Sequence, residues 1–187
     1  DANRRFTQFI EKNYPVWLNS TDRPVMSPDI LPQFVQNHLE NNEKVVMILM
    51  DCLRADQMKA MTGQLSKIFH IETEYCFSIL PTATPYSRNA IFSGYFPHEL
   101  QVKYPALWPQ MWGNEKSMNQ FEEQFLKDYF SRNGLGSKSV RYHKILNYDE
   151  GNRLVNRIGE YKEIDILALV VNFIDSLGHS RSESKIL

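Results

Sequence analysis

The run VVMILM at residues 45–50, followed at once by Asp51, is the stretch that decides the fold class. A short, continuously apolar run rich in β-branched side chains is typical of a strand buried on both faces, as in a parallel sheet. A second apolar strand is expected over residues 164–174, and it also leads into an aspartate, Asp175. Two buried strands that each end at a carboxylate point to one functional edge of a sheet.

The rest of the chain alternates helical and extended patterns. Strands that alternate with helices predict an α/β fold with a mainly parallel sheet flanked by helices. Ligand sites in such sheets lie beyond the carboxyl ends of the strands, where Asp51 and Asp175 are expected. Residues 1–40 are expected to form a helical linker region that precedes a domain over 41–187. Helices are expected over 3–14, 29–41, 55–68, 85–92, 118–131 and 149–161, and shorter strands over 71–79 and 139–143.

Composition narrows the class of protein. A formal net charge of −1 lacks the basic surplus that duplex nucleic-acid binders carry. No run approaches the roughly 20 apolar residues that span a bilayer, and no export signal is visible, so we expect a cytoplasmic protein without membrane insertion. Cys52 and Cys76 are too few for a disulfide framework, and their apolar neighbours predict buried free thiols. The missing initial Met and the polar end of the chain predict a fragment truncated at both ends.

The segment PTATPYSR at residues 81–88 has two interpretations. Thr84 is expected at the N-cap of a helix, because the proline after it favours the first helical position. In one interpretation Thr84 is only a cap. In the other, its hydroxyl lies beside the free N–H groups of Tyr86 and Ser87, where an anion binds, and attacks phosphorus. Arg88, one turn later, is expected on the same face and within reach of a phosphate oxygen.

Asp175 and His179 are four residues apart, so their side chains converge if the chain turns helically after the strand. Such a pair suits zinc, although Asp175 as a cap with a solvated His179 is an equal alternative. A hydroxyl is a poor nucleophile at neutral pH unless a base or a metal activates it. Asp51, Asp175 and His179 are the residues that could hold metal ions beside Thr84, in the two-metal arrangement that serves in-line displacement at phosphorus.

The remaining candidate side chains favour structural roles. We expect His70, His98 and His143 to be structural or solvated, because no ligand partner stands at a useful spacing. No G-x-G-x-x-G follows the first strand, which disfavours a dinucleotide site. An aromatic group either stacks nucleobases over the site or, as we favour, forms a packed cluster. Its members are Tyr95, Phe96, Tyr104, Trp108 and Trp112.

The order of these motifs resembles the alkaline phosphatase superfamily, with Asp51 after a strand, a helix start at Thr84 and a later D-x-x-G-H at residues 175–179. Residues 81–94 resemble the nucleophile segment of its nucleotide pyrophosphatase and phosphodiesterase branch. More closely, the chain is similar to the PglZ domain of PorX-like response regulators of the Bacteroidota, which are linked to type IX secretion. The pieces that carry this similarity are Val46–Gln57, Ser78–Gly94, Tyr142–Asn147 and Asn172–Asp175.

The resemblance implies a role for each matching residue. Thr84 would be the nucleophile and would also contact both metals. Asp51 would ligate one metal, and Asp175 with His179 the other. Two Zn²⁺ ions are implied, with Mn²⁺ as an alternative. The family completes the site with an Asp-His pair and a further histidine, which are expected beyond Leu187, so residues 41–187 would be the N-terminal part of an alkaline-phosphatase-like domain.

The implied function is a metal-dependent phosphodiesterase that acts on nucleotides or short oligonucleotides, cyclic ones included, through a phosphothreonine intermediate. Arg88 is the expected substrate-binding residue. As the output domain of a two-component response regulator, it would have a histidine kinase and a sigma factor as signalling partners, and a homodimer is left open. Two alternatives remain, a metal-stabilised module for partner binding or dimerisation without turnover, and a phosphomonoesterase.

Overall fold

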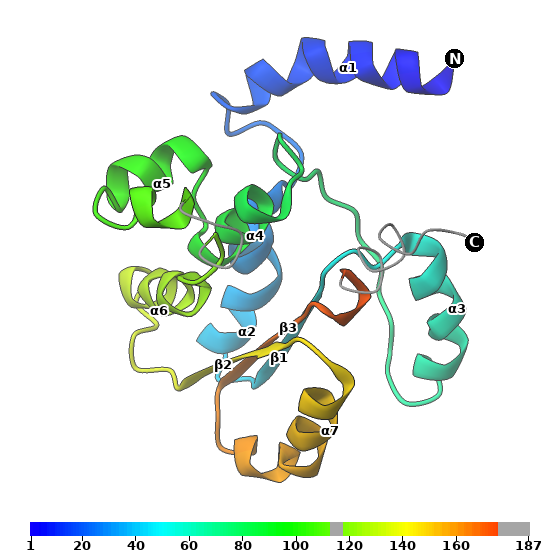
Figure 1. Cartoon of the computed structure of the whole chain (residues 1–187), viewed down its shortest axis with the longest axis vertical. Helices are drawn as coiled ribbons and strands as arrows, with labels where there is room; N and C mark the ends of the chain where they lie inside the picture. The colour runs from blue at the N-terminus through cyan, green and yellow to red at the C-terminus, as the bar shows by residue number, and fades with distance from the viewer. Residues whose placement is uncertain (113–117, 176–187) are drawn as a thin grey trace, which may run out of the picture.

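The computed structural model describes residues 1–112 and 118–175, and its centre is a three-stranded parallel sheet (Figure 1). The strands β1 (Val45–Met50), β2 (Val140–Ile145) and β3 (Ile166–Val171) lie in the order β1-β3-β2. The central strand β3 is buried over all but its last residue, which accounts for its continuously apolar sequence. The predicted α/β fold with a parallel sheet flanked by helices is therefore confirmed.

The three strands end level with one another. Met50 of β1 and Ile145 of β2 both pair with Val171, the last residue of β3. The residues that follow β1 and β3, Asp51 and Asn172, therefore emerge at the same edge. This is the carboxyl edge, where ligands bind in sheets of this kind.

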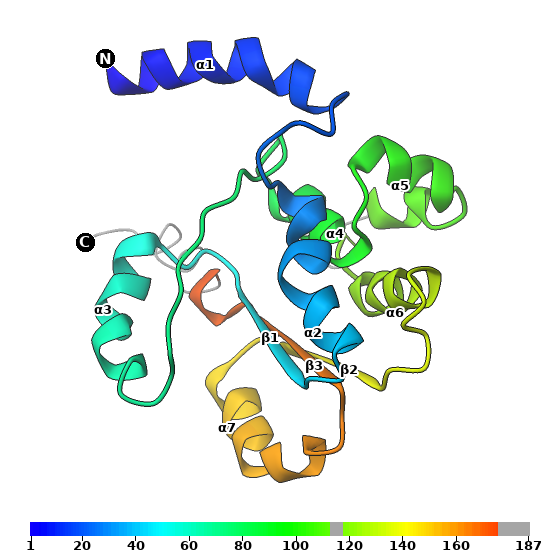
Figure 2. The same ribbon diagram turned by 180° about the vertical axis from the view of Figure 1, so that it is seen from behind.

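One face of the sheet is covered by α4 (Thr84–Ser93), α6 (Glu122–Arg132) and α2 (Asn37–Glu40), which follows a π-helical turn over Pro32–Gln36 (Figure 2). Apolar side chains of these segments and of β3 form the main core. Burying each large apolar side chain stabilises the fold by about 1.5–3 kcal/mol. The fully or almost fully buried members include Leu31, Val35, Leu39, Phe92, Phe125, Leu126, Phe130, Ile166, Ala168 and Val170.

The opposite face carries α7 (Tyr148–Asn156) beside β2. The single helix expected over 149–161 is interrupted at Arg157, after which a separate 3-10 turn spans Ile158–Tyr161. Between α4 and α6, where no element was expected, the chain forms a helix, α5 (Pro97–Lys103), and a 3-10 segment, Trp108–Trp112.

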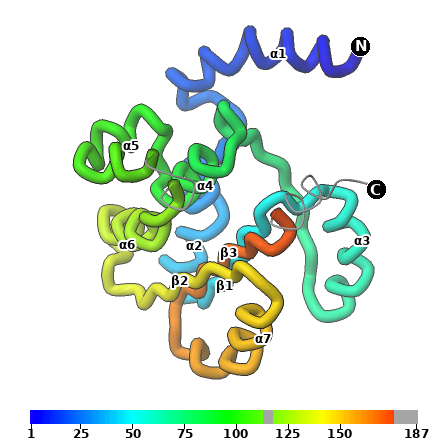
Figure 3. The backbone as a smooth tube through the Cα atoms, viewed as in Figure 1, coloured from blue at the N-terminus to red at the C-terminus, as the bar shows by residue number. Residues whose placement is uncertain are grey.

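In the described part of the chain, three α-helices contribute no buried residue: α7 and the peripheral helices α1 (Ala2–Trp17) and α3 (Ala55–Leu65) (Figure 3). The end of α1 touches the body through Trp17, whose ring lies 4.9 Å from that of Phe77. The region predicted as a linker over 1–40 therefore divides, because residues from Met26 onward contribute buried side chains to two apolar cores, whereas most of α1 stands clear. Within the described ranges, every helix is too short or too polar to cross a membrane.

The strand expected over 71–79 is not part of the sheet. The segment is mostly exposed, and one isolated parallel bridge joins Phe77 to Met26. Its polar residues, such as Glu72 and Glu74, offer no continuous apolar face for burial against the sheet.

The expectation of buried thiols is also wrong. Cys76 in the segment 71–79 and Cys52 in the turn after β1 are free but exposed, because neither segment is covered by a helix.

A small hydrogen-bonded box joins the starts of β2 and β3. The Asp165 carboxylate accepts hydrogen bonds from the backbone N–H and the hydroxyl of Ser139, both at 2.7 Å. The Ser139 hydroxyl oxygen in turn accepts the backbone N–H of Asp165 at 2.9 Å. The hydroxyl bond first, and the backbone bond next, lower the pKa of Asp165 below its ordinary value of 3.8.

We expect Ser139→Ala to lower the free energy of unfolding by about 0.5–1 kcal/mol near pH 7, because one hydrogen bond to a partly solvated carboxylate is lost. The folded pKa of Asp165 lies below the unfolded one, so this contribution is present above about pH 4 and disappears as the pH falls through the folded pKa. Urea denaturation at about pH 7 and about pH 3 measures it. A difference that stays constant between the two pH values would contradict the assignment, and Ser66→Ala at an exposed helix end is the control.

Candidate active site

Two polar residues continue the strands at the carboxyl edge. The Asp51 N–H donates to the Val171 carbonyl at 3.0 Å, and the Asn172 N–H donates to the Ile145 carbonyl at 2.9 Å. Cys52 then turns the chain away with a positive φ of 59°. The strand pairing itself therefore fixes where the side chains of Asp51 and Asn172 begin.

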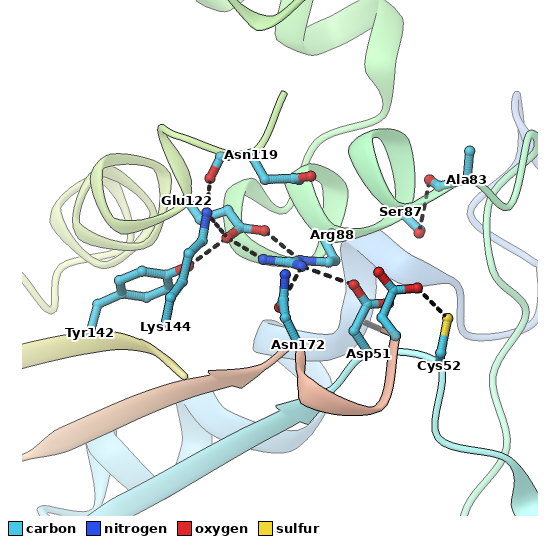
Figure 4. A network of polar contacts seen from close by, with 11 residues as sticks. Asp51, Cys52, Ala83, Ser87, Arg88, Asn119, Glu122, Tyr142, Lys144 and Asn172 are labelled. Carbon is cyan, nitrogen blue, oxygen red and sulfur yellow. Dashed lines mark hydrogen bonds and ion pairs between the residues drawn. The ribbon is translucent and has the colours of Figure 1, made fainter. Parts of the chain in front are cut away.

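Arg88, on helix α4, contacts both of these residues. Its Nη1 donates to Asp51 Oδ2 and to Asn172 Oδ1, both at 3.0 Å (Figure 4). Residues four apart share a helix face, so Thr84 lies on the face that Arg88 turns toward the strand ends. The structure thus brings the first turn of α4 to the edge that carries Asp51.

The other side of Arg88 is held by Glu122, the first residue of α6. Arg88 Nε and Nη2 donate to the two carboxylate oxygens of Glu122, each at 2.7 Å, in a bidentate pair. The Glu122 side chain is fully buried and also accepts the Tyr142 hydroxyl. Lys144 Nζ lies 3.2 Å from the same carboxylate. A buried cluster therefore links α4, α6 and all three strand ends.

Neighbouring charges and burial keep Arg88 and Tyr142 protonated. Burial alone lowers the pKa of Arg88, but the hydrogen bond and charge of Glu122, and then those of Asp51, raise it above the ordinary value. Burial, followed by the Glu122 charge and hydrogen bond, raises the pKa of Tyr142 above its usual range. Arg88 is thus a cation and Tyr142 a hydrogen-bond donor at neutral pH.

Asp175 reaches the same region through Cys52. The Cys52 thiol donates to Asp175 Oδ1 at 2.9 Å. This hydrogen bond, then burial, then the charges of Asp175 and Asp51, raise the pKa of Cys52 to about 11. Cys52 is therefore a thiol rather than a nucleophilic thiolate at neutral pH. Through the hydrogen bond from the Cys52 thiol, the structure places Asp175 beside the residue that directly follows Asp51.

The start of α4 differs from the expectation by one residue. Ala83 precedes the helix as its N-cap, and Thr84 is the first helical residue. The Ala83 carbonyl accepts the N–H groups of Tyr86 and Ser87 at 3.0 and 3.1 Å, so the pair of free donors expected there is absent. The helix satisfies these donors itself because its first turn closes tightly on Ala83. Thr84 consequently has no capping role, and its side chain is partly exposed.

The metal ligands stay predictions. Among residues 1–112 and 118–175, no three side chains of the metal-ligating kinds stand close enough together to hold an ion. His179 lies outside the described residues. The donors that are described fit part of a site for a hard or borderline cation, namely two carboxylates at one strand edge. Asp51 Oδ2 is bound by Arg88, whereas its Oδ1 makes no hydrogen bond to any described residue.

Sequence reasoning missed Glu122, because an acidic residue at the start of an amphipathic helix normally signals only a favourable helix dipole. Asn172 and Tyr142 lay inside the segments that carried the resemblance, but nothing local assigned them a role. The aromatic group is packed rather than open for stacking, as favoured, but it is divided, because Phe96 belongs to a second core with Met26, Ile79 and Ala90 while the other four pack against the main core. For example, the ring of Tyr104 lies 4.9 Å from that of Phe125.

The model of a family described as the BREX system PglZ alkaline phosphatase-like domain matches residues 30–187. None of the curated proteins matches the chain. The matched range contains the whole sheet and every residue of the cluster around Arg88.

Proposed function

Because the chain belongs to the PglZ alkaline phosphatase-like family, we propose that it carries the nucleophile and part of the metal site of a metal-dependent phosphoesterase. The observation that carries the proposal is the reach of Arg88 from α4 to Asp51. This contact ties the helix that begins at Thr84 to the strand end that bears a candidate metal ligand. The resulting combination is a hydroxyl, two carboxylates and a helix start at one sheet edge, as two-metal phosphoryl chemistry requires.

In the proposed reaction Thr84 is the nucleophile. Its Oγ1 forms a bond to phosphorus while the bond from phosphorus to the leaving alcohol oxygen breaks in line, and the hydroxyl proton is lost to solvent. Water then cleaves the phosphothreonine and restores the hydroxyl. Two zinc ions, when bound, supply charge neutralisation and lower the pKa of the attacking oxygen. Asp51, Asp175 and His179 are the proposed ligands within this chain.

The finer assignment is a phosphodiesterase for nucleotides or short oligonucleotides, linear or cyclic. It is supported by the similarity of residues 81–94 to a diesterase nucleophile segment. On the same resemblance we propose that the chain belongs to the output part of a PorX-like response regulator that controls type IX secretion. Its proposed partners are a histidine kinase and a sigma factor.

The test uses the full-length protein, loaded with Zn²⁺, and compares hydrolysis of bis-nitrophenyl phosphate with that of nitrophenyl phosphate. We expect faster cleavage of the diester, and loss of cleavage after removal of metal with a chelator, because the proposed nucleophile is activated only by bound metal. Activity should return when Zn²⁺ or Mn²⁺ is added back.

Each other result selects a different function. Faster cleavage of the monoester would assign a phosphomonoesterase. Bound zinc without cleavage of either ester would favour a metal-stabilised module for partner binding or dimerisation. Cleavage that persists in the chelator-treated protein would contradict a metal-dependent mechanism.

A further inference from the structure

We propose that Arg88 is a positioning residue that orients the carboxylate of Asp51 for metal binding, and that the buried Glu122 carboxylate holds Arg88 in place for this task. The inference rests on the proposed metal-dependent function. It differs from the expectation from sequence, in which Arg88 binds the substrate phosphate directly.

The guanidinium of Arg88 binds partners on two sides. Its Nε and Nη2 bind Glu122, while Nη1 binds Asp51 and Asn172. A guanidinium is planar, so two parallel bonds to Glu122 fix the direction in which Nη1 points. Glu122 thereby sets the position of the N–H groups that hold Asp51.

The two carboxylate oxygens of Asp51 differ in their contacts. Arg88 binds Oδ2, and Oδ1 makes no hydrogen bond to a described residue. With one oxygen fixed, the carboxylate is held in one rotamer, and Oδ1 is the oxygen left for a cation at the edge that also carries Cys52 (Figure 4). Hydrogen bonds that orient ligating carboxylates in this way commonly contribute a tenfold to hundredfold gain in metal affinity.

The burial of the Arg88 side chain favours the positioning role over direct binding of the substrate. The Arg88 side chain is 4% exposed and the Glu122 side chain 0%, whereas Asp51 at the outer end of the cluster is 12% exposed. A phosphate group would have to displace Asp51 or Asn172 to reach Nη1. At the Arg88 end, the exposed member of the cluster is therefore a carboxylate, which attracts a cation and repels a bare phosphate. The more exposed Lys144, at 29%, pairs with Glu122 and not with Asp51.

The cluster also couples the ligand to the nucleophile. Arg88 and Thr84 belong to the same rigid helix, one turn apart. The contact that orients Asp51 therefore also sets the distance between the start of α4 and the end of β1. A change in the Arg88–Glu122 pair should disturb metal binding first, because Asp51 is its direct partner.

The test measures Zn²⁺ affinity in the full-length protein by competition with a chelating dye. We expect Arg88→Lys and Glu122→Gln each to weaken Zn²⁺ binding by about 10–100-fold. At saturating Zn²⁺, KM for the diester should change by less than about twofold, because neither side chain contacts the substrate. Glu122→Gln has nearly the shape of the native residue and carries the test alone if Arg88→Lys fails to fold.

The matched control is Arg23→Lys, which makes the same chemical change in another bidentate pair, between Arg23 and Asp29, outside the site. It should leave the Zn²⁺ affinity unchanged. Folded variants of Arg88 and Glu122 that bind Zn²⁺ as tightly as the wild type would overturn the inference, and a rise in KM alone would assign Arg88 to the substrate.

A wild-type protein that binds Zn²⁺ but cleaves neither ester overturns the proposed function, while the affinities still decide the role of Arg88. A wild-type protein that binds no Zn²⁺ overturns both.

Discussion

Thr84→Ala is expected to lower kcat for diester cleavage on the order of 10³-fold or more, because the atom that bonds to phosphorus is removed. The hydroxyl caps nothing, since Ala83 is the residue that precedes the helix, so folding should be preserved. Thr84→Ser keeps an oxygen at the same position and should retain measurable turnover. Steady-state kinetics with zinc at saturation gives the comparison, and circular dichroism checks the fold.

The control for this prediction is Thr82→Ala, which removes an exposed hydroxyl two residues earlier and should leave kcat within about twofold of the wild type. Trapping of the covalent intermediate provides a second readout. A phosphothreonine at Thr84 should be detected by mass spectrometry after a rapid acid quench. Equal kcat values for Thr84→Ala and the wild type would remove Thr84 from the reaction.

Glu122→Ala is expected to have the largest effect on stability, about 3–5 kcal/mol in the free energy of unfolding. The Glu122 side chain is fully buried, and its removal leaves the guanidinium of Arg88 without its bidentate partner in a site that water does not reach. It also removes the acceptor of the Tyr142 hydroxyl. Urea denaturation of the metal-free protein measures the loss.

The neighbouring Glu123→Ala is the matched control. Glu123 pairs with Lys127 at 2.6 Å on the same helix, but its side chain is 48% exposed. Its removal should cost less than about 0.5 kcal/mol, as is typical of exposed pairs. Similar losses for the two glutamates would mean that burial does not govern the Arg88–Glu122 pair.

The element predicted best from sequence is the strand whose burial is complete. The run at 166–171 is buried as expected, because it is the central strand of the sheet. The run at 45–50 is also a strand, but its predicted burial on both faces is wrong, because it lies at the edge of the sheet with Val46 and Ile48 more than half exposed. The segment 71–79 resembled them in β-branched and aromatic content, yet it is an exposed connector, because sheet membership depends on a partner strand and not on propensity.

By itself, the sequence determined the fold class and the position of Asp51 directly after a strand, because a short apolar run encodes a strand and its end. The strand expected over 164–174 instead ends at Val171, so Asp175 lies four residues beyond it, in a helical turn. The sequence also placed a helix start beside Thr84, within one residue. Only the tertiary structure decided that Arg88 turns inward to Glu122 and Asp51. Residues 51, 88 and 122 are distant in sequence, and a charge pair across such distances leaves no local pattern. The pairing arises only when α4 and α6 pack on the same face of the sheet and must neutralise the charges that they bury together.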